Sequence, residues 1–210
     1  VTRRTRVKVC GVTRLEDALA AAACGVDAIG FNFWSTSSRY IGETVAASIA
    51  SQLPDSVTKV GLFVNAETTL IDQVLSEVDL DFLQFHGVES RETCVAFGMP
   101  YIKAIRATSA EEIKIEVAKY EDAKAILLDT PARGQFGGSG SAFDWRIIPT
   151  LDMPLILAGG LDPRNVVDAI LQVQPCVVDV ASGVESGKGI KDKVLMRQFM
   201  VAVQQADRSK

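Results

Sequence analysis

The sequence predicts an α/β fold, namely a single (βα)8 barrel with a closed parallel sheet of eight strands. Short β-branched runs alternate with amphipathic helical runs along the whole chain, and eight such units follow one another without a large insertion. With 210 residues and 48% hydrophobic content, the chain can bury one sizeable core, so we expect one catalytic domain over residues 1–210. A doubly wound open sheet shares the alternation and is the alternative.

The expected strands are short, mostly apolar runs with little alternation between polar and apolar residues. Such runs are typical of strands that meet helices on one face and fill a barrel interior with the other. In chain order, they cover residues 6–10, 28–33, 57–63, 82–86, 101–105, 125–128, 155–158 and 177–180.

Two of the helices between these strands have N-terminal signals. Thr13 precedes Glu16 by three residues, as in a capping box, ahead of the run LEDALAAAA. Asp162 and Pro163 supply a cap and a first-turn proline before the run RNVVDAIL. We therefore expect helices to begin directly after Thr13 and directly after Asp162.

Composition and charge point to a small-molecule ligand. No apolar stretch approaches the roughly 20 residues that a membrane-spanning helix needs, and the basic start VTRRTRVK lacks the apolar core of a signal peptide. A net charge of −4 lacks the basic excess of nucleic-acid-binding proteins. We expect a cytoplasmic protein that binds neither membrane nor nucleic acid. A monomer is our expectation for its oligomeric state.

The cysteines and the single histidine are too far apart in sequence to suggest a metal site. Cys10, Cys24, Cys94 and Cys176 form no CxxC pair, and His86 is the only histidine. We expect no metal. The last three cysteines are interpreted as small buried hydrophobic residues in a reducing compartment.

Two potentially reactive side chains end expected strands. Cys10 precedes Gly11 in KVCGVTRLEDA, and Asp129 ends the run AILLD. Because the carboxyl ends of barrel strands surround one pocket, a base and an acid can face the same ligand there. The alternatives are that Cys10 is a packing residue and that Asp129 braces the long glycine-rich loop at residues 129–145. We expect that loop to cover the pocket, with a plain surface connection as the alternative.

Glycine-bearing turns follow the seventh and eighth expected strands, in AGGLDPRN and VASGVESGKGIKD. Glycine lets backbone N–H groups approach a ligand closely, and a short helix beginning near Ser182 directs its positive end at an anion. Barrel enzymes often bind phosphate between these two loops. We expect Gly159, Gly160, Ser182 and Gly183 to bind a phosphate, with ordinary tight turns as the alternative.

Taken together, these motifs resemble the phosphoribosylanthranilate isomerase family. The resemblance extends over nearly the whole chain through KVCGVTRLEDA, GFNFWSTSSRY, KVGLFVN, LQFHGVE, LLDT, FGGSGSAFDW, LAGGLDPRNV and VDVASGVESGKGIKD. It implies a TIM barrel that performs an Amadori rearrangement in tryptophan biosynthesis. The implied substrate is N-(5-phosphoribosyl)anthranilate, a small phosphosugar, and the implied product is 1-(2-carboxyphenylamino)-1-deoxyribulose 5-phosphate. No cofactor or metal is implied.

The resemblance also implies roles for individual residues. Cys10 matches the general base, Asp129 the general acid, and Arg39 in SSRY the residue that binds the anthranilate carboxylate. The alternatives for Arg39 are a solvated loop charge and an ion-pair partner. The chain departs from the family pattern within residues 32–38 and at Ala181, and neither departure touches the acid or the base.

Further polar residues complete the expected substrate site. We expect His86 to pack at the barrel mouth or shape the anthranilate pocket, with direct acid–base catalysis as the alternative. Asp179 is expected either to reach a sugar hydroxyl or to satisfy polar groups inside the barrel. Burial is expected to raise the pKa of Asp129, which helps an acid. Lys8 lies two residues before Cys10, so it points the same way and can favour a thiolate if it is close enough.

Three other functions remain to be weighed against this one. The Amadori isomerase of the histidine pathway uses aspartates on its first and fifth strands, where this chain has Cys10 and the run IKAIR. Indole-glycerol-phosphate synthase has catalytic lysines and an N-terminal extension that are not evident here. A phosphosugar-binding protein without catalysis would retain only the anion site.

Overall fold

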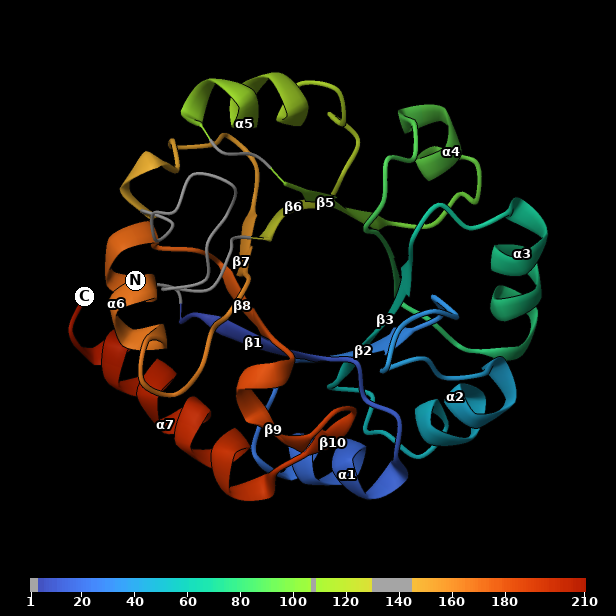
Figure 1. Cartoon of the computed structure of the whole chain (residues 1–210), viewed down its shortest axis with the longest axis horizontal. Helices are drawn as coiled ribbons and strands as arrows, with labels where there is room; N and C mark the ends of the chain where they lie inside the picture. Colours follow the sequence, from blue (N-terminus) through green and yellow to red (C-terminus); the bar gives the residue numbers. More distant parts are fainter. Residues whose placement is uncertain (1–3, 107–108, 130–144) are drawn as a thin grey trace.

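The strands close into a parallel barrel, which excludes the open-sheet alternative. The structure is a computed structural model that describes residues 4–106, 109–129 and 145–210. Each strand pairs in parallel with the next along the chain, and the eighth pairs with the first (Figure 1). The strands are β1 (Arg6–Cys10), β2 (Ala28–Asn32), β3 (Thr58–Phe63), β4 (Phe82–Phe85), β5 (Tyr101–Ile105), β6 (Ala125–Asp129), β7 (Leu155–Ala158) and β8 (Val177–Val180).

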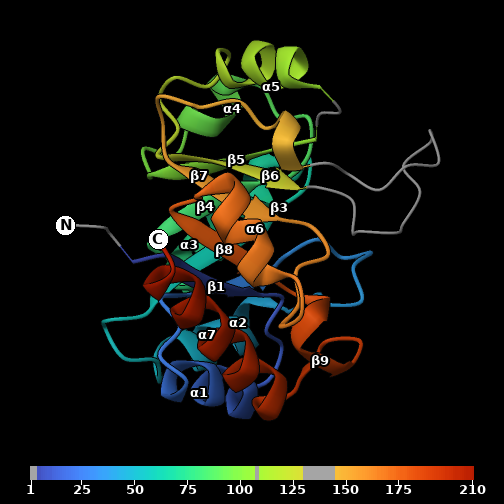
Figure 2. The same ribbon diagram turned by 90° about the vertical axis from the view of Figure 1, so that its left-hand side faces the viewer.

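Helices surround the barrel, as Figure 1 shows. They are α1 (Leu15–Ala23), α2 (Glu43–Ala50), α3 (Thr68–Glu77), α4 (Arg91–Val95), α5 (Ala110–Val117), α6 (Val166–Val173) and α7 (Lys193–Arg208). Two 3₁₀ turns, η1 (Trp145–Ile147) and η2 (Ser182–Val184), precede β7 and follow β8. A two-stranded antiparallel hairpin, β9 (Glu185–Gly187) and β10 (Ile190–Lys191), follows η2. In Figure 2 it lies at the end of the barrel toward which the strands run.

The apolar core has two layers because each strand has two buried faces. Side chains such as Val60, Ile102 and Leu127 fill the barrel interior. A larger layer, which includes Phe31 and Phe199, lies between the strands and the helices. This double burial explains why the strands read as apolar runs rather than as alternating ones.

The two predicted helix starts are early, by one residue for α1 and by three for α6. The N-cap of α1 is Arg14, without a side-chain cap, and the Thr13 hydroxyl instead donates to the Gly189 carbonyl at 2.8 Å. Helix α6 begins at Val166, because Asp162 accepts from the Arg164 amide at 2.7 Å in a turn that precedes the helix. Both motifs lie just before their helices, but the side chain expected to cap each helix makes another hydrogen bond. Thr13 makes a tertiary contact, and Asp162 makes a contact within the preceding turn.

The structure also bears on the expectations for the cysteines, a membrane-spanning helix, a metal site and the long loop. None of the four cysteines, all within the described residues, is in a disulfide. Cys94 is buried as predicted, whereas Cys24 and Cys176 are half-buried. Within the described ranges, no helix has the length and apolarity that crossing a bilayer requires. The same ranges contain no cluster of three His, Cys, Asp or Glu side chains arranged for a metal ion. The loop expected to cover the pocket spans residues 129–145, of which residues 130–144 lie outside the described residues.

Candidate active site

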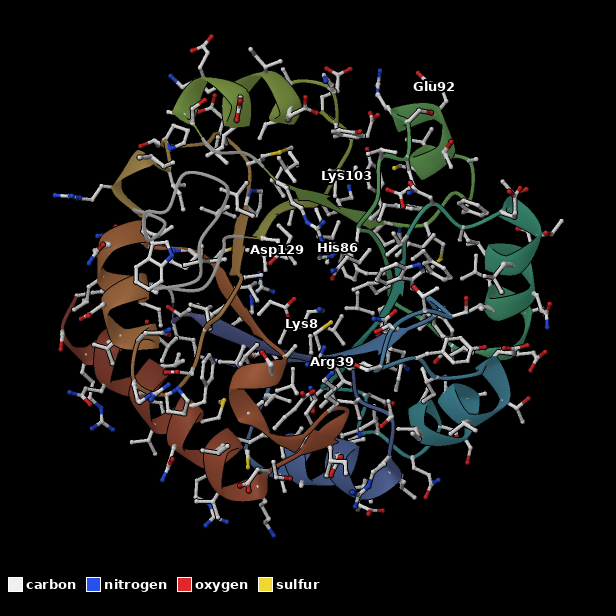
Figure 3. The ribbon with its side chains drawn as sticks, in the orientation of Figure 1. Lys8, Arg39, His86, Glu92, Lys103 and Asp129 are labelled. Carbon is white, nitrogen blue, oxygen red and sulfur yellow. The ribbon has the colours of Figure 1, made fainter. Side chains whose placement is uncertain are left out.

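A cavity of about 990 Å³ opens at the carboxyl ends of the barrel strands. Of the predicted site residues, only Gly183 is not in its lining. The others, which line the cavity, are Cys10, Arg39, His86, Asp129, Gly159, Gly160, Asp179 and Ser182. In Figure 3, His86 and Asp129 lie on one side of the barrel opening, with Lys8 and Arg39 on the other. The barrel therefore brings a thiol and a carboxylate from β1 and β6 to one cavity, as its geometry predicts.

Cys10 is packed beside a buried ion pair. Lys8, on the same face of β1, places its Nζ 3.0 and 3.1 Å from the two carboxylate oxygens of Asp179 on β8. The neighbouring strand carries Gly30, where a Cβ would lie 2.9 Å from the Cys10 Sγ and 3.1 Å from the Lys8 Nζ. A side chain on Gly30 would therefore occupy the space that both polar atoms need.

Burial dominates the ionisation of this thiol. Burial raises the pKa of Cys10 above its ordinary value, although the ammonium groups of Lys8 and Lys191 act in the opposite direction. For Lys8, burial acts to lower the pKa, but the nearby Asp179 carboxylate and Cys10 outweigh it and raise the pKa. Lys8 is thus a fixed positive charge next to Cys10, as its spacing suggested, and it offsets burial of the thiol only in part.

Asp129 ends β6 and is held by cationic or hydrogen-bonding groups. Its Oδ2 lies 3.3 Å from the His86 Nε2 and 3.6 Å from the Arg106 Nε. Burial acts to raise the pKa of Asp129, but the hydrogen bond and charge of His86, followed by Arg106, bring it below the ordinary value. The expectation of a raised pKa is therefore wrong, because it considered burial without these two neighbours.

His86 connects this carboxylate to the barrel interior. Its Nδ1 lies 2.9 Å from the Gln84 side-chain nitrogen, two residues earlier on β4. If that amide donates to Nδ1, the ring proton is on Nε2 and faces Asp129. Gln84 is fully buried, and its Oε1 finds no partner within the described part of the chain.

Arg39 is an ion-pair partner, one of the two alternatives considered for it. Its Nε and Nη2 donate to the two carboxylate oxygens of Glu185 at 2.7 and 2.8 Å. A guanidinium carries five N–H donors, so three remain beyond the two that Glu185 accepts. Because Arg39 also lines the cavity, the ion pair leaves it able to bind a carboxylate there.

The two glycine turns meet at the edge of the cavity. Gly159 and Gly160 have φ values of 91° and 59°, a region that favours glycine. At Gly183, which does not line the cavity, a Cβ would lie 1.9 Å from the Leu161 carbonyl oxygen. Gly183 therefore lets η2 pack closely on the turn after β7, while Ser182 faces the cavity.

Comparison with known proteins identifies the family. The family model described as N-(5'-phosphoribosyl)anthranilate (PRA) isomerase matches residues 7–202. The N-(5'-phosphoribosyl)anthranilate isomerase of Pseudomonas fluorescens (strain SBW25) is 52% identical over 199 residues, which are 94% of this chain and 95% of that protein. The chain belongs to this isomerase family.

Solved structures of the phosphoribosylanthranilate isomerase family share the fold. The crystal structure of the enzyme from Thermotoga maritima has a TM-score of 0.84 and 40% identity, covering 96% of this chain and 99% of that one. A family member in complex with reduced 1-(o-carboxyphenylamino)-1-deoxyribulose 5-phosphate has a TM-score of 0.82 and 38% identity, with the same coverage.

Two buried lysines of this family member were missed by sequence reasoning. Lys103 on β5 donates to the Phe85 and Gly87 carbonyls at 3.3 and 2.7 Å, one on each side of His86. Lys191, in the hairpin, donates to the Cys10 carbonyl at 2.6 Å. Lys103 pairs with Glu89 and Lys191 with Glu185, and both glutamates lie within motifs quoted above without a role assigned to them. Only the unusual burial of the two lysines reveals a role.

Proposed function

We propose that this cavity binds N-(5'-phosphoribosyl)anthranilate and converts it to 1-(2-carboxyphenylamino)-1-deoxyribulose 5-phosphate, with Asp129 as general acid and Cys10 as general base. One observation carries the proposal: a thiol and a carboxylate line the same cavity, beside two glycine turns suited to a phosphate. This isomerisation belongs to tryptophan biosynthesis, and the family match supports it over the histidine-pathway and indole-glycerol-phosphate alternatives.

Asp129 acts first. Its carboxylic acid gives a proton to the furanose ring oxygen, the bond from that oxygen to C1 breaks, and the nitrogen lone pair forms an iminium ion with C1. The carboxylate that remains is stabilised by His86 at 3.3 Å and Arg106 at 3.6 Å. Because these neighbours lower the pKa of Asp129, its protonated form is a stronger acid, but a smaller fraction of the protein has Asp129 protonated.

Cys10 acts second. Its thiolate removes the proton from C2, and the electron pair of that bond neutralises the iminium nitrogen to give an enolamine. The enolamine becomes the ketone when C1 gains a proton and the C2 hydroxyl gives one up. The positive charges of Lys8 and Lys191 support the thiolate, and Gly30 leaves the space in which Lys8 and Cys10 meet.

The remaining residues bind the two ends of the substrate. Arg39 takes the anthranilate carboxylate with the donors that Glu185 leaves free. The turns at Gly159, Gly160 and Ser182 take the phosphate through backbone N–H groups. Asp179 is interpreted as the partner of Lys8, one of its two earlier alternatives. A monomer in the cytoplasm that uses no cofactor remains our expectation.

A turnover assay tests this function. Purified protein is mixed with freshly generated N-(5'-phosphoribosyl)anthranilate, and the decay of anthranilate-type fluorescence is compared with the uncatalysed reaction. We expect multiple turnovers without added metal or cofactor. Binding of the reduced product analogue without any turnover would instead identify a phosphosugar-binding protein without catalysis.

A further inference from the structure

The β9–β10 hairpin lies outside the barrel, yet it contacts the active site. Figure 1 places it next to α1, and Figure 2 shows it at the end of the barrel toward which the strands run, where the cavity opens. Its first residue, Glu185, and its last, Lys191, pair with each other at 2.8 Å, and both side chains are 5% exposed or less. Burying two charges is costly unless each has several partners, so the hairpin merits a functional explanation.

Glu185 holds the guanidinium of Arg39 in one orientation. Both of its carboxylate oxygens accept from Arg39, a two-point contact that fixes the plane of the guanidinium. The stem of Arg39 lies on Gly11, where a Cβ would be only 2.5 Å from the Arg39 Cδ. Arg39 is therefore fixed at both its stem and its head, next to the residue that follows Cys10.

Lys191 connects this pair to two other parts of the site. Its Nζ donates to Glu185 at 2.8 Å, to the Cys10 carbonyl at 2.6 Å and to the Ala181 carbonyl at 3.2 Å. An ammonium has three protons, and these three acceptors use all of them. The buried side chain of Lys191 thus connects the end of β1 at Cys10, the turn after β8 at Ala181, and Glu185, the partner of Arg39.

The hairpin is also tied to the helix behind it. The Lys191 amide donates to the buried Asp17 carboxylate of α1 at 3.0 Å. The Thr13 hydroxyl donates to the carbonyl of Gly189, in the hairpin turn. The hairpin therefore forms a fixed support for Arg39 rather than a loose connection.

We propose that the β9–β10 hairpin, through Glu185 and Lys191, positions Arg39 and so sets the selectivity of the site for ligands that carry a carboxylate. This inference rests on the proposed function, because it assigns the ligand carboxylate to Arg39. Glu185 does not line the cavity, so it is a positioning residue that reaches the substrate only through Arg39. Arg39 and Lys191 each carry a positive charge and Glu185 carries a negative one, so the three side chains have a net charge of +1 that matches the carboxylate of the ligand.

Two ligands that differ only in the carboxylate test the inference. One is reduced 1-(o-carboxyphenylamino)-1-deoxyribulose 5-phosphate, and the other is the same compound with an unsubstituted phenyl ring. Calorimetry gives the Kd of each for the intact chain and for Glu185→Gln. We expect Glu185→Gln to raise the Kd of the carboxylate ligand about tenfold and to leave that of the phenyl ligand within about twofold.

A matched control and a double-mutant cycle separate positioning from folding. Glu121→Gln removes an exposed partner of Arg91 and should change neither Kd. In an Arg39→Ala background, Glu185→Gln should cause no further loss of carboxylate selectivity. If Glu185→Gln does not fold, Glu185→Asp retains the charge on a shorter side chain, and a reduced selectivity is the supporting result.

The outcomes that overturn the inference are distinct from failure of the proposed function. If the intact chain binds neither ligand and shows no turnover, the proposed function fails. If the intact chain is active but Glu185→Gln weakens both ligands equally, changes neither, or tightens the carboxylate ligand, only the positioning role fails. Unchanged selectivity in Glu185→Asp, tested in place of a misfolded Glu185→Gln, has the same meaning.

Discussion

The two sides of the cavity treat their reactive groups in opposite ways. On the β1 and β8 side, Cys10 is 8% exposed beside a buried ion pair, and burial raises its pKa. On the β4 and β6 side, the Asp129 side chain is 29% exposed, and His86 and Arg106 lower its pKa against the effect of burial. In the free protein, each group therefore favours the form that is inactive in the proposed mechanism.

This difference shows how the site can use two groups that titrate far apart. The active form needs a protonated Asp129 and an ionised Cys10, the reverse of the state that their pKa values favour. Between the two pKa values, the protonated fraction of Asp129 falls with pH as fast as the ionised fraction of Cys10 rises. The population of the active form is then small but independent of pH.

The largest expected effects come from removing either group. Cys10→Ala and Asp129→Asn should each lower kcat by about 10²–10⁴-fold, because each removes one proton-transfer step. Binding of the reduced product analogue should stay within a few-fold in both variants. Cys24→Ala is a control, since Cys24 does not line the cavity. Near-normal turnover in Cys10→Ala or Asp129→Asn would refute that assignment.

Removing the charge on the β1 side is expected to have the next largest effect. Lys8→Met leaves the buried Asp179 carboxylate unpaired beside Cys10, which should lower the free energy of unfolding by about 3–5 kcal/mol. Chemical denaturation measures the change. Lys59→Met removes the pair with Asp79, whose side chain is 86% exposed and stays solvated, and should cost about 1 kcal/mol or less. Equal losses in the two variants would contradict the special role of the Lys8 ion pair.

A smaller effect is expected from adding one methyl group at Gly30, next to the Cys10 Sγ and the Lys8 Nζ. In Gly30→Ala, the new Cβ would lie 2.9 Å from the Cys10 Sγ and should displace it, lowering kcat/KM about tenfold. Gly42→Ala is the matched control, because the nearest atom to its Cβ is 4.0 Å away. If both alanine variants keep full activity, the packing of Lys8 and Cys10 around Gly30 does not matter for catalysis.

The barrel and the ends of its strands could be predicted from the sequence because both depend on local patterns. The strand at residues 6–10 and its terminal cysteine follow from an apolar run and the glycine after it. The contacts between the hairpin and the site could not be predicted in the same way, because Arg39 and Glu185 are 146 residues apart and Lys191 is 181 residues from Cys10. A Ser-Gly-Lys-Gly stretch at residues 186–189 is a turn signal that would have indicated a hairpin there.

The electrostatics of Asp129 show the same limit. Burial of a strand end can be inferred from sequence, and by itself it raises a carboxyl pKa. The group that reverses the effect, His86, is 43 residues away and reaches Asp129 only through the order of strands in the barrel. The direction of a pKa shift therefore depends on tertiary neighbours that local motifs do not identify.

The most direct test of the opposed ionisation is the pH dependence of kcat/KM for the intact chain and for His86→Asn. Losing His86 should raise the pKa of Asp129 toward its ordinary value, so the acidic limb should move to higher pH. The ratio of variant to intact kcat/KM, in which titration of the substrate cancels, should then rise with pH and reach a plateau. A ratio that falls with pH, or an acidic limb that does not move, would contradict the account.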